Sequence, residues 1–196
     1  NLRLRDAAYV RSFEVWIAEQ AFAKAGISMP KTAPKTKQTI PPMFTPYKVR
    51  DVVLKNRIVV SPMAQYSAVD GIAGDYHLVH LGSRAMGGAG LVFAEMTCVS
   101  AEARITPACP GWYAPEHTQA WKRIVDFVHA NSDAKIAVQL GHAGAKGSTK
   151  RAWDGIDQPL DAGNWPLISA SEQQYLNGIS QVAKAATKEQ MAQVLN

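Results

Sequence analysis

Two absences limit what this chain can be before any motif is considered. No stretch of its 196 residues approaches the roughly eighteen uncharged apolar residues that a membrane helix needs. The first residues also lack the charged start, apolar middle and cleavage site of a secretory signal, and there is no initiator methionine. We therefore expect a cytoplasmic protein that does not bind a membrane, with a natural start upstream of Asn1.

Cysteine is scarce, and positive charge does not form a patch. Cys98 and Cys109 have neither metal-ligand spacing nor a disulfide framework, so we expect two reduced thiols. His77 and His80 lie one helical turn apart without an evident carboxylate partner, so they do not indicate a metal site. The net charge of +5 is scattered apart from three lysines in one Pro/Thr-rich stretch, so we expect no nucleic-acid partner.

The composition changes once along the chain. Residues 6–25 have apolar side chains at helical spacing, and Gly26 can end that helix. Residues 30–42 are rich in proline and lysine and have no apolar period, which is typical of a linker. We therefore expect a helical piece over 1–29, a linker over 30–42 and the main domain over 43–196.

The main domain alternates predicted strands with predicted helices. Short apolar runs predict buried strands at 57–61, 90–94 and 135–139. Helical spacing of apolar residues predicts helices at 77–86, 115–130 and 187–196. Buried strands separated by helices indicate a parallel sheet covered on both faces, as in a (β/α)8 barrel or a doubly wound sheet.

Two features favour the barrel. No Gly-x-Gly-x-x-Gly follows the first strand, and unusual residues follow all three strands, where barrel active sites lie. A complete barrel has eight strands and runs to about 250 residues. We therefore predict an α/β (β/α)8 TIM barrel of which this chain holds only the first half. Residues 145–186 show no regular pattern and are expected to form a long loop or lid at its mouth.

The first strand end, 61–66, suits contact with a flat heterocycle. Pro62 fits a strand exit, Met63 can form an apolar wall, and the Tyr66 hydroxyl can reach a substrate carbonyl. The residues alone favour a plainer alternative, which is a proline turn with a core methionine and a surface tyrosine.

The other two strand ends carry one polar residue each. Glu95 ends the second strand, and we expect it to pair with an Arg or Lys of a neighbouring strand, with Met96 and Thr97 at the rim. Gln139 ends the third strand, and its amide offers the donor and the acceptor that a ring edge with C=O and N–H groups requires. His142 is expected to be a buried structural histidine.

Three stretches together resemble the Old Yellow Enzyme family of flavin-dependent ene-reductases. They are 61–66 (Ser-Pro-Met-Ala-Gln-Tyr), 104–106 (Arg-Ile-Thr) and 139–144 (Gln-Leu-Gly-His-Ala-Gly), and the resemblance covers roughly residues 43–196. It implies FMN as cofactor and NAD(P)H as reductant. The residues that it implies at the flavin are Ser61, Pro62, Met63 and Ala64, Met96 through its backbone, and Gln139 at the pyrimidine edge. Tyr66 would face the substrate.

One residue departs from the pattern of that family. Ala64 stands where the thermophilic-like branch usually has a cysteine, and this difference argues against ordinary small enones as substrates. Residues 74–82 and 163–169 resemble the C-terminal half of two-part aromatic acyl-CoA hydroxylase-reductases. That resemblance implies that 1–29 is the tail of an upstream hydroxylase domain and that the substrate is an aromatic-derived CoA thioester. The resemblance is also compatible with a homo-oligomer of the full-length protein.

The family mechanism implies that NAD(P)H reduces the flavin, which passes hydride to an alkene conjugated to a carbonyl group. The catalytic residues are expected to follow the third strand, beyond this sequence, so the isolated chain is predicted to be inactive. Two alternatives remain. One is a flavin barrel that oxidises NADH or dihydropyrimidines, and the other is a non-catalytic interaction module that uses residues 1–42 as a docking helix and tether.

Overall fold

A computed structural model describes residues 5–30 and 39–195 of the chain. The first element is helix α1 (Ala7–Ala25), which is capped by Asp6 at its start and by Gly26 at its end. The Asp6 side chain accepts hydrogen bonds from the N–H groups of Ala8 at 2.9 Å and Tyr9 at 3.2 Å. Gly26 adopts a left-handed φ of 72°, which favours glycine. The predicted helix is confirmed, whereas most of the predicted linker lies outside the described residues.

A short connecting region follows α1. It consists of a 3-10 turn η2 (Pro42–Phe44) and an antiparallel hairpin of β1 (Tyr47–Val49) and β2 (Val52–Leu54). The hairpin leads directly into the main sheet.

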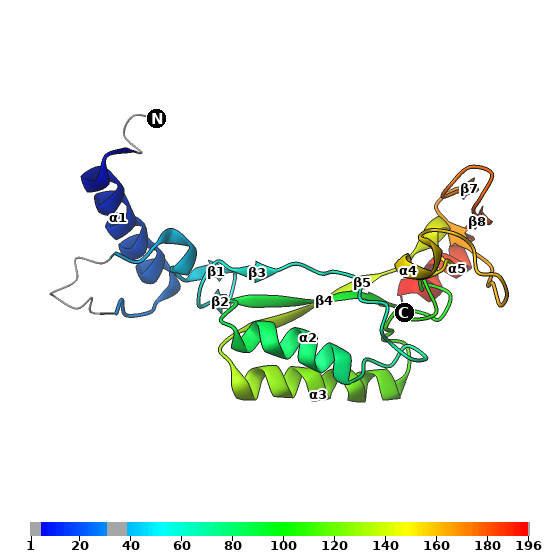
Figure 1. Cartoon of the computed structure of the whole chain (residues 1–196), viewed down its shortest axis with the longest axis horizontal. Helices are drawn as coiled ribbons and strands as arrows, with labels where there is room; N and C mark the ends of the chain where they lie inside the picture. Colours follow the sequence, from blue (N-terminus) through cyan, green and yellow to red (C-terminus); the bar gives the residue numbers. More distant parts are fainter. Residues whose placement is uncertain (1–4, 31–38, 196) are drawn as a thin grey trace.

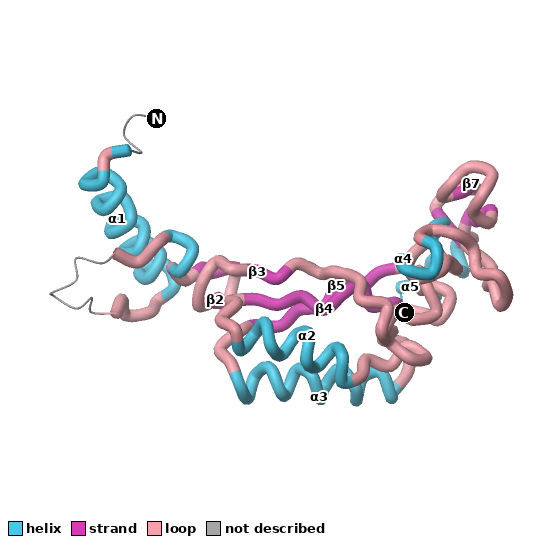
Figure 2. Tube along the Cα trace, in the orientation of Figure 1, coloured by secondary structure: helices cyan, strands magenta, loops and turns pink. Residues whose placement is uncertain are grey.

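A parallel three-stranded sheet forms the centre of the main domain. Its order is β3 (Val59–Val60), β4 (Leu91–Cys98) and β5 (Lys135–Gly141). Helices α2 (Asp75–Met86) and α3 (Pro115–Asn131) connect the strands and lie side by side on one face of the sheet (Figures 1 and 2). All three predicted strands are confirmed in place and direction. However, β3 is shorter than predicted, and β4 and β5 continue beyond their predicted ends, to Cys98 and Gly141.

The core lies between this sheet and the two helices. Val92 and Ala94 of β4 pack there with Leu81 of α2, and Ile124 and Val128 of α3 complete the cluster. All five are at most 2% exposed.

The opposite face of the sheet is not covered by helices in the described part of the chain. Val59 of β3 is 47% exposed, and Gln139 of β5 is also exposed. The expectation of a sheet covered on both faces is therefore met on one face only within residues 5–30 and 39–195.

The segment after β5 is more ordered than we expected. It contains η3 (Gly144–Lys146), the short helix α4 (Ala152–Gly155) and a small sheet in the order β6-β8-β7. The strands of that sheet are β6 (Ile168–Ser169), β7 (Gln173–Gln174) and β8 (Val182–Ala185). The prediction of a patternless loop over 145–186 is wrong, because these strands of two to four residues are too short to show a period.

Helix α5 (Lys188–Leu195) ends the described chain. Thr187 Oγ1 accepts from the Gln190 N–H at 3.2 Å, while Gln190 Oε1 accepts from the Thr187 N–H at 2.9 Å. This reciprocal cap confirms the predicted helix start. No helix in the described ranges has the length and apolar character needed to cross a membrane.

The contrast between Leu81 and Val79 on α2 tests the position of the core. Leu81 is 2% exposed and Val79 is 64% exposed. We expect Leu81→Ala to lower the free energy of unfolding by about 2–5 kcal/mol, because it leaves a cavity in the core. Val79→Ala is the control and should change it by less than about 0.5 kcal/mol. Urea denaturation followed by circular dichroism measures both, and equal losses would contradict this packing.

Candidate functional site

Met96 and Gln139 lie side by side at the carboxyl end of the sheet. Their Cα atoms pair across β4 and β5, after a register shift between Ala94 and Met96. Ala94 and Val138, the pair before them, face the helices. Because side chains alternate along a strand, Met96 and Gln139 face the uncovered side of the sheet. The structure therefore brings these two predicted site residues together on one face.

The segment 61–64 extends β3 along the same end of the sheet. Val60 pairs with Val92 in parallel register, and the Gln65 N–H donates to Glu95 Oε2 of β4 at 2.8 Å. Ser61, Met63 and Ala64 are exposed, whereas Pro62 is half-buried. Met63, at 45% exposed, is not a core residue, so the plainer alternative of a core methionine is wrong.

Tyr66 has an unusual backbone and a half-buried ring. Its φ of 49° lies in the left-handed region, which is uncommon for a residue with a bulky side chain. The ring packs against a buried cluster that contains Cys98 and Cys109, and it meets Trp153 edge-on with ring centroids 6.1 Å apart. Burial, followed by the neighbouring Cys109, raises the pKa of the Tyr66 hydroxyl above its ordinary value of 10.0. Tyr66 is therefore not the surface tyrosine of the plainer alternative.

Cys98 and Cys109 are both free and buried beneath Tyr66. Cys109 Sγ accepts a hydrogen bond from the Thr106 N–H at 3.4 Å. A hydrogen bond from the Cys98 thiol, followed by the groups of Thr106, lowers the pKa of Cys109 to about 7. The same hydrogen bond and burial raise the pKa of Cys98, which therefore stays protonated at neutral pH.

Glu95 has a different partner from the one we expected. Its Oε1 lies 3.1 Å from Nε2 of His77, and both side chains are 2% exposed. The prediction of an Arg or Lys on a neighbouring strand is wrong, because the partner is a histidine of α2. The view that His77 lacks a carboxylate partner is wrong for the same reason. Within the described residues, no three His, Cys, Asp or Glu side chains are grouped as a metal ion would need.

His142 lies just beyond β5 and is half-buried instead of fully buried. Its Nδ1 accepts from the Gly144 N–H at 3.0 Å. The residue lines an apolar cavity of about 500 Å³, together with Met191 and Leu195 of α5. Burial lowers the pKa of His142 below its ordinary value of 6.5.

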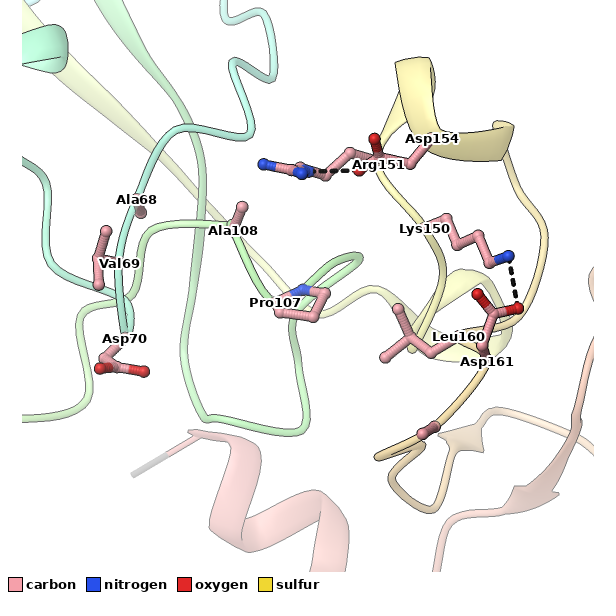
Figure 3. Close-up of a pocket in the computed structure, with 11 residues that line it drawn as sticks. Ala68, Val69, Asp70, Pro107, Ala108, Lys150, Arg151, Asp154, Leu160 and Asp161 are labelled. Carbon is pink, nitrogen blue, oxygen red and sulfur yellow. Dashed lines mark hydrogen bonds and ion pairs between the residues drawn. The ribbon is translucent and has the colours of Figure 1, made fainter.

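A second cavity of about 620 Å³ lies between the loops after β3 and β4 and the segment after β5 (Figure 3). Two ion pairs stand in its wall, Arg151 with Asp154 and Lys150 with Asp161, each at 2.6 Å. Sequence reasoning missed these four residues because they fall in the segment without a period. The cavity wall does not include the residues predicted to line a flavin.

Comparisons with known proteins agree on one family. The model of the NADH:flavin oxidoreductase / NADH oxidase family matches residues 42–196. An NADH:flavin oxidoreductase of Gibberella zeae is 39% identical over 158 residues, which are 79% of this chain and 38% of that protein. An NADPH dehydrogenase of Listeria monocytogenes serotype 4a is 49% identical over 106 residues, which are 53% of this chain and 31% of that protein.

Solved structures show the same fold. Morphinone reductase in complex with tetrahydroNAD superposes with a TM-score of 0.64 at 24% identity, over 78% of this chain and 43% of that one. The chain therefore spans less than half the length of these relatives.

The lowered pKa of His142 predicts how stability depends on pH. The folded state favours the neutral ring. The contribution of His142 to the free energy of unfolding is therefore complete above pH 6.5 and is lost as the pH falls through the lowered pKa. NMR titration of the imidazole should give a midpoint below 6.5, and His142→Gln should make the loss of stability in mild acid less steep. A midpoint at or above the ordinary value would contradict this environment.

Proposed function

Because the chain belongs to the NADH:flavin oxidoreductase / NADH oxidase family, we propose that residues 43–196 form the first strands of a flavin-binding (β/α)8 barrel oxidoreductase. FMN and NAD(P)H are the cofactors of this family. One observation carries the proposal, namely the pairing of Met96 with Gln139 on the uncovered face of a parallel sheet, at its carboxyl end. Ligands of α/β barrels bind at this end of the strands.

The chemistry of Gln139 fits the pyrimidine edge of a flavin. That edge alternates carbonyl oxygens with an N–H group, and a side-chain amide offers one donor group and one acceptor. Gln139 is exposed, and its side chain takes part in no hydrogen bond among the described residues. The amide is therefore free to bind a ring edge.

The surroundings of Gln139 fit the flat ring itself. The Met63 side chain is exposed beside the strand end, and Met96 is half-buried next to Gln139. Gly141 leaves room for Met96, because a Cβ at Gly141 would lie 2.8 Å from Met96 Cγ. We assign Ser61, Pro62, Met63 and Ala64, with Met96 and Gln139, to the binding of FMN.

When bound, FMN supplies hydride transfer between NAD(P)H and an alkene conjugated to a carbonyl group. The residues of this chain contribute by binding the flavin and the substrate. The Tyr66 hydroxyl, whose pKa burial raises above its ordinary value of 10.0, is protonated at neutral pH and can donate a hydrogen bond to the substrate carbonyl oxygen. The backbone of Tyr66 is fixed in the left-handed region, which limits where that hydroxyl can point.

We assign the chain more narrowly to the reductase part of an aromatic acyl-CoA hydroxylase-reductase in the cytoplasm. Helix α1 supports this assignment, because it buries Ala18, Ala21 and Ala25 but leaves an aromatic row exposed. Tyr9 and Phe13 stack at 6.4 Å, and Trp16 continues the row. An exposed aromatic row of this kind suits residues 1–29 as the tail of an adjoining domain.

Substitution of Gln139 tests the flavin site. We expect Gln139→Ala to weaken FMN binding by about 5-fold to 30-fold, because one or two hydrogen bonds of about 1 kcal/mol each are lost. The control is Gln119→Ala on the exposed side of α3, which should leave the affinity unchanged. The measurement is quenching of FMN fluorescence by the protein at its full genomic length. Equal affinities would contradict the assignment, and no FMN binding at all would favour a non-catalytic module.

Two substrates separate the narrow assignment from the broad one. The protein at full genomic length, with FMN and NAD(P)H, should reduce a CoA-thioester dienone faster than cyclohexenone. The reason is that Ala64 stands where a cysteine would contact small enones. Absorbance loss of NAD(P)H under anaerobic conditions gives both rates. Preference for cyclohexenone would overturn the acyl-CoA assignment and leave the flavin oxidoreductase intact.

A further inference from the structure

A buried carboxyl group joins the sheet to helix α2. Glu95 is 4% exposed, its Oε2 accepts from the Gln65 N–H at 2.8 Å, and its Oε1 lies 3.1 Å from His77 Nε2. Burial of a carboxylate is costly unless other groups compensate its charge. Here the two compensating groups come from two different elements, the loop after β3 and the first turn of α2.

The orientation of the His77 ring is determined by its other nitrogen. Nδ1 accepts from the Gly74 N–H at 3.2 Å, so the ring proton of the neutral histidine is on Nε2, toward Glu95. The ring lies edge-on to Tyr76 and Trp121, with centroid distances of 5.9 Å and 6.1 Å. His77 Nε2 therefore faces Glu95 Oε1 from a fixed position, as a close contact at 3.1 Å that does not have the geometry of a hydrogen bond.

Gln65 is held at three points. Besides its backbone contact with Glu95, its Oε1 accepts from the Tyr76 hydroxyl at 2.9 Å, and its Nε2 donates to the Met63 carbonyl oxygen at 2.8 Å. The first turn of α2 thus contacts Gln65 both through Tyr76 and, by way of Glu95, through His77. Through its contact with Met63, Gln65 also restrains the backbone beside the proposed flavin site.

Backbone–backbone hydrogen bonds do not anchor this segment within the described residues. In the described part of the chain, residues 62–67 make no backbone–backbone hydrogen bond, and the next one joins the Ala68 N–H to the Ala108 oxygen at 3.0 Å. The Glu95 carboxylate therefore takes the place of a strand partner for this segment.

We propose that Glu95 and Tyr76 are positioning residues that fix the backbone of 61–66 through Gln65 and thereby set the affinity for FMN. The effect on FMN rests on the proposed function, whereas the anchoring itself does not. The two parts can therefore be tested separately.

The anchoring is tested on the chain without FMN. Glu95→Leu has a side chain of similar size without an acceptor oxygen, so the Gln65 N–H loses its contact. We expect the Gln65 amide to exchange with deuterium about tenfold faster in NMR, with the amides of Leu81 and Ile124 as reference for global unfolding. Acceleration of Gln65 no greater than that of the reference amides would overturn the proposal.

The effect on FMN is tested with a milder variant on the protein at full genomic length. Tyr76 is 52% exposed, so Tyr76→Phe removes one hydroxyl contact to Gln65 without disturbing the core. We expect FMN to bind about 3-fold to 10-fold more weakly at an unchanged unfolding midpoint. Arg123→Gln is the control, because it breaks only the exposed pair with Asp75 at 2.7 Å, on the same turn of α2.

The outcomes separate a positioning role from a structural one. Weaker FMN binding by Tyr76→Phe, with Arg123→Gln unchanged, supports the proposal even if Glu95→Leu does not fold. FMN affinity that is unchanged in Tyr76→Phe, or a fall in stability alone, would overturn it. If the unsubstituted protein binds no FMN, the proposed function fails together with the effect on FMN, while Gln65 exchange still decides the anchoring.

Discussion

The rest of the main domain depends on how one buried carboxyl group is accommodated. Glu95 sits in β4 at the register shift that follows Ala94, and its side chain faces α2. The extra residue of a bulge lets Ala94 and Glu95 both face the helix layer, and Met96 then returns to the opposite face. Without that shift, strict alternation would direct Met96 to the helices and separate it from Gln139. The burial of Glu95 and the position of the proposed site therefore both depend on the same bulge.

The proposed site lies on the face of the sheet that no helix covers in the described part of the chain. Parallel sheets are normally buried on both sides, and here Val59 leaves apolar surface exposed. Gln139 and Met96 point to that same side. A segment or partner that covers this face would therefore also enclose the proposed site.

Sequence patterns predicted the long elements and missed the local exceptions. Helices α2, α3 and α5 have a clear 3.6-residue period, and the rule that parallel strands end at one edge was enough to bring Met96 and Gln139 together. The bulge was missed because an apolar run that meets a charged residue looks like the end of a strand, so the second strand was ended at Glu95, three residues before Cys98. The partner of Glu95 was missed because His77 lies on the preceding helix, and periodicity does not show which helical residue faces a given strand position. The ion pairs of Lys150 and Arg151 depend on a tertiary fold of short segments, which have no period at all.

The strained backbone of Tyr66 follows from the two anchors on either side of it. Gln65 is fixed to Glu95, and Ala68 is fixed to Ala108 by its backbone N–H. The chain must change direction within the residues between them, and Ser67 supports that turn by donating its hydroxyl to the Gln65 oxygen at 2.9 Å. A left-handed conformation at a non-glycine residue costs about 1–2 kcal/mol, and burial of the Tyr66 ring against Cys98 and Cys109 can offset a cost of that size. The contact of Gln65 with Glu95 is therefore one of the constraints on the position of the Tyr66 ring.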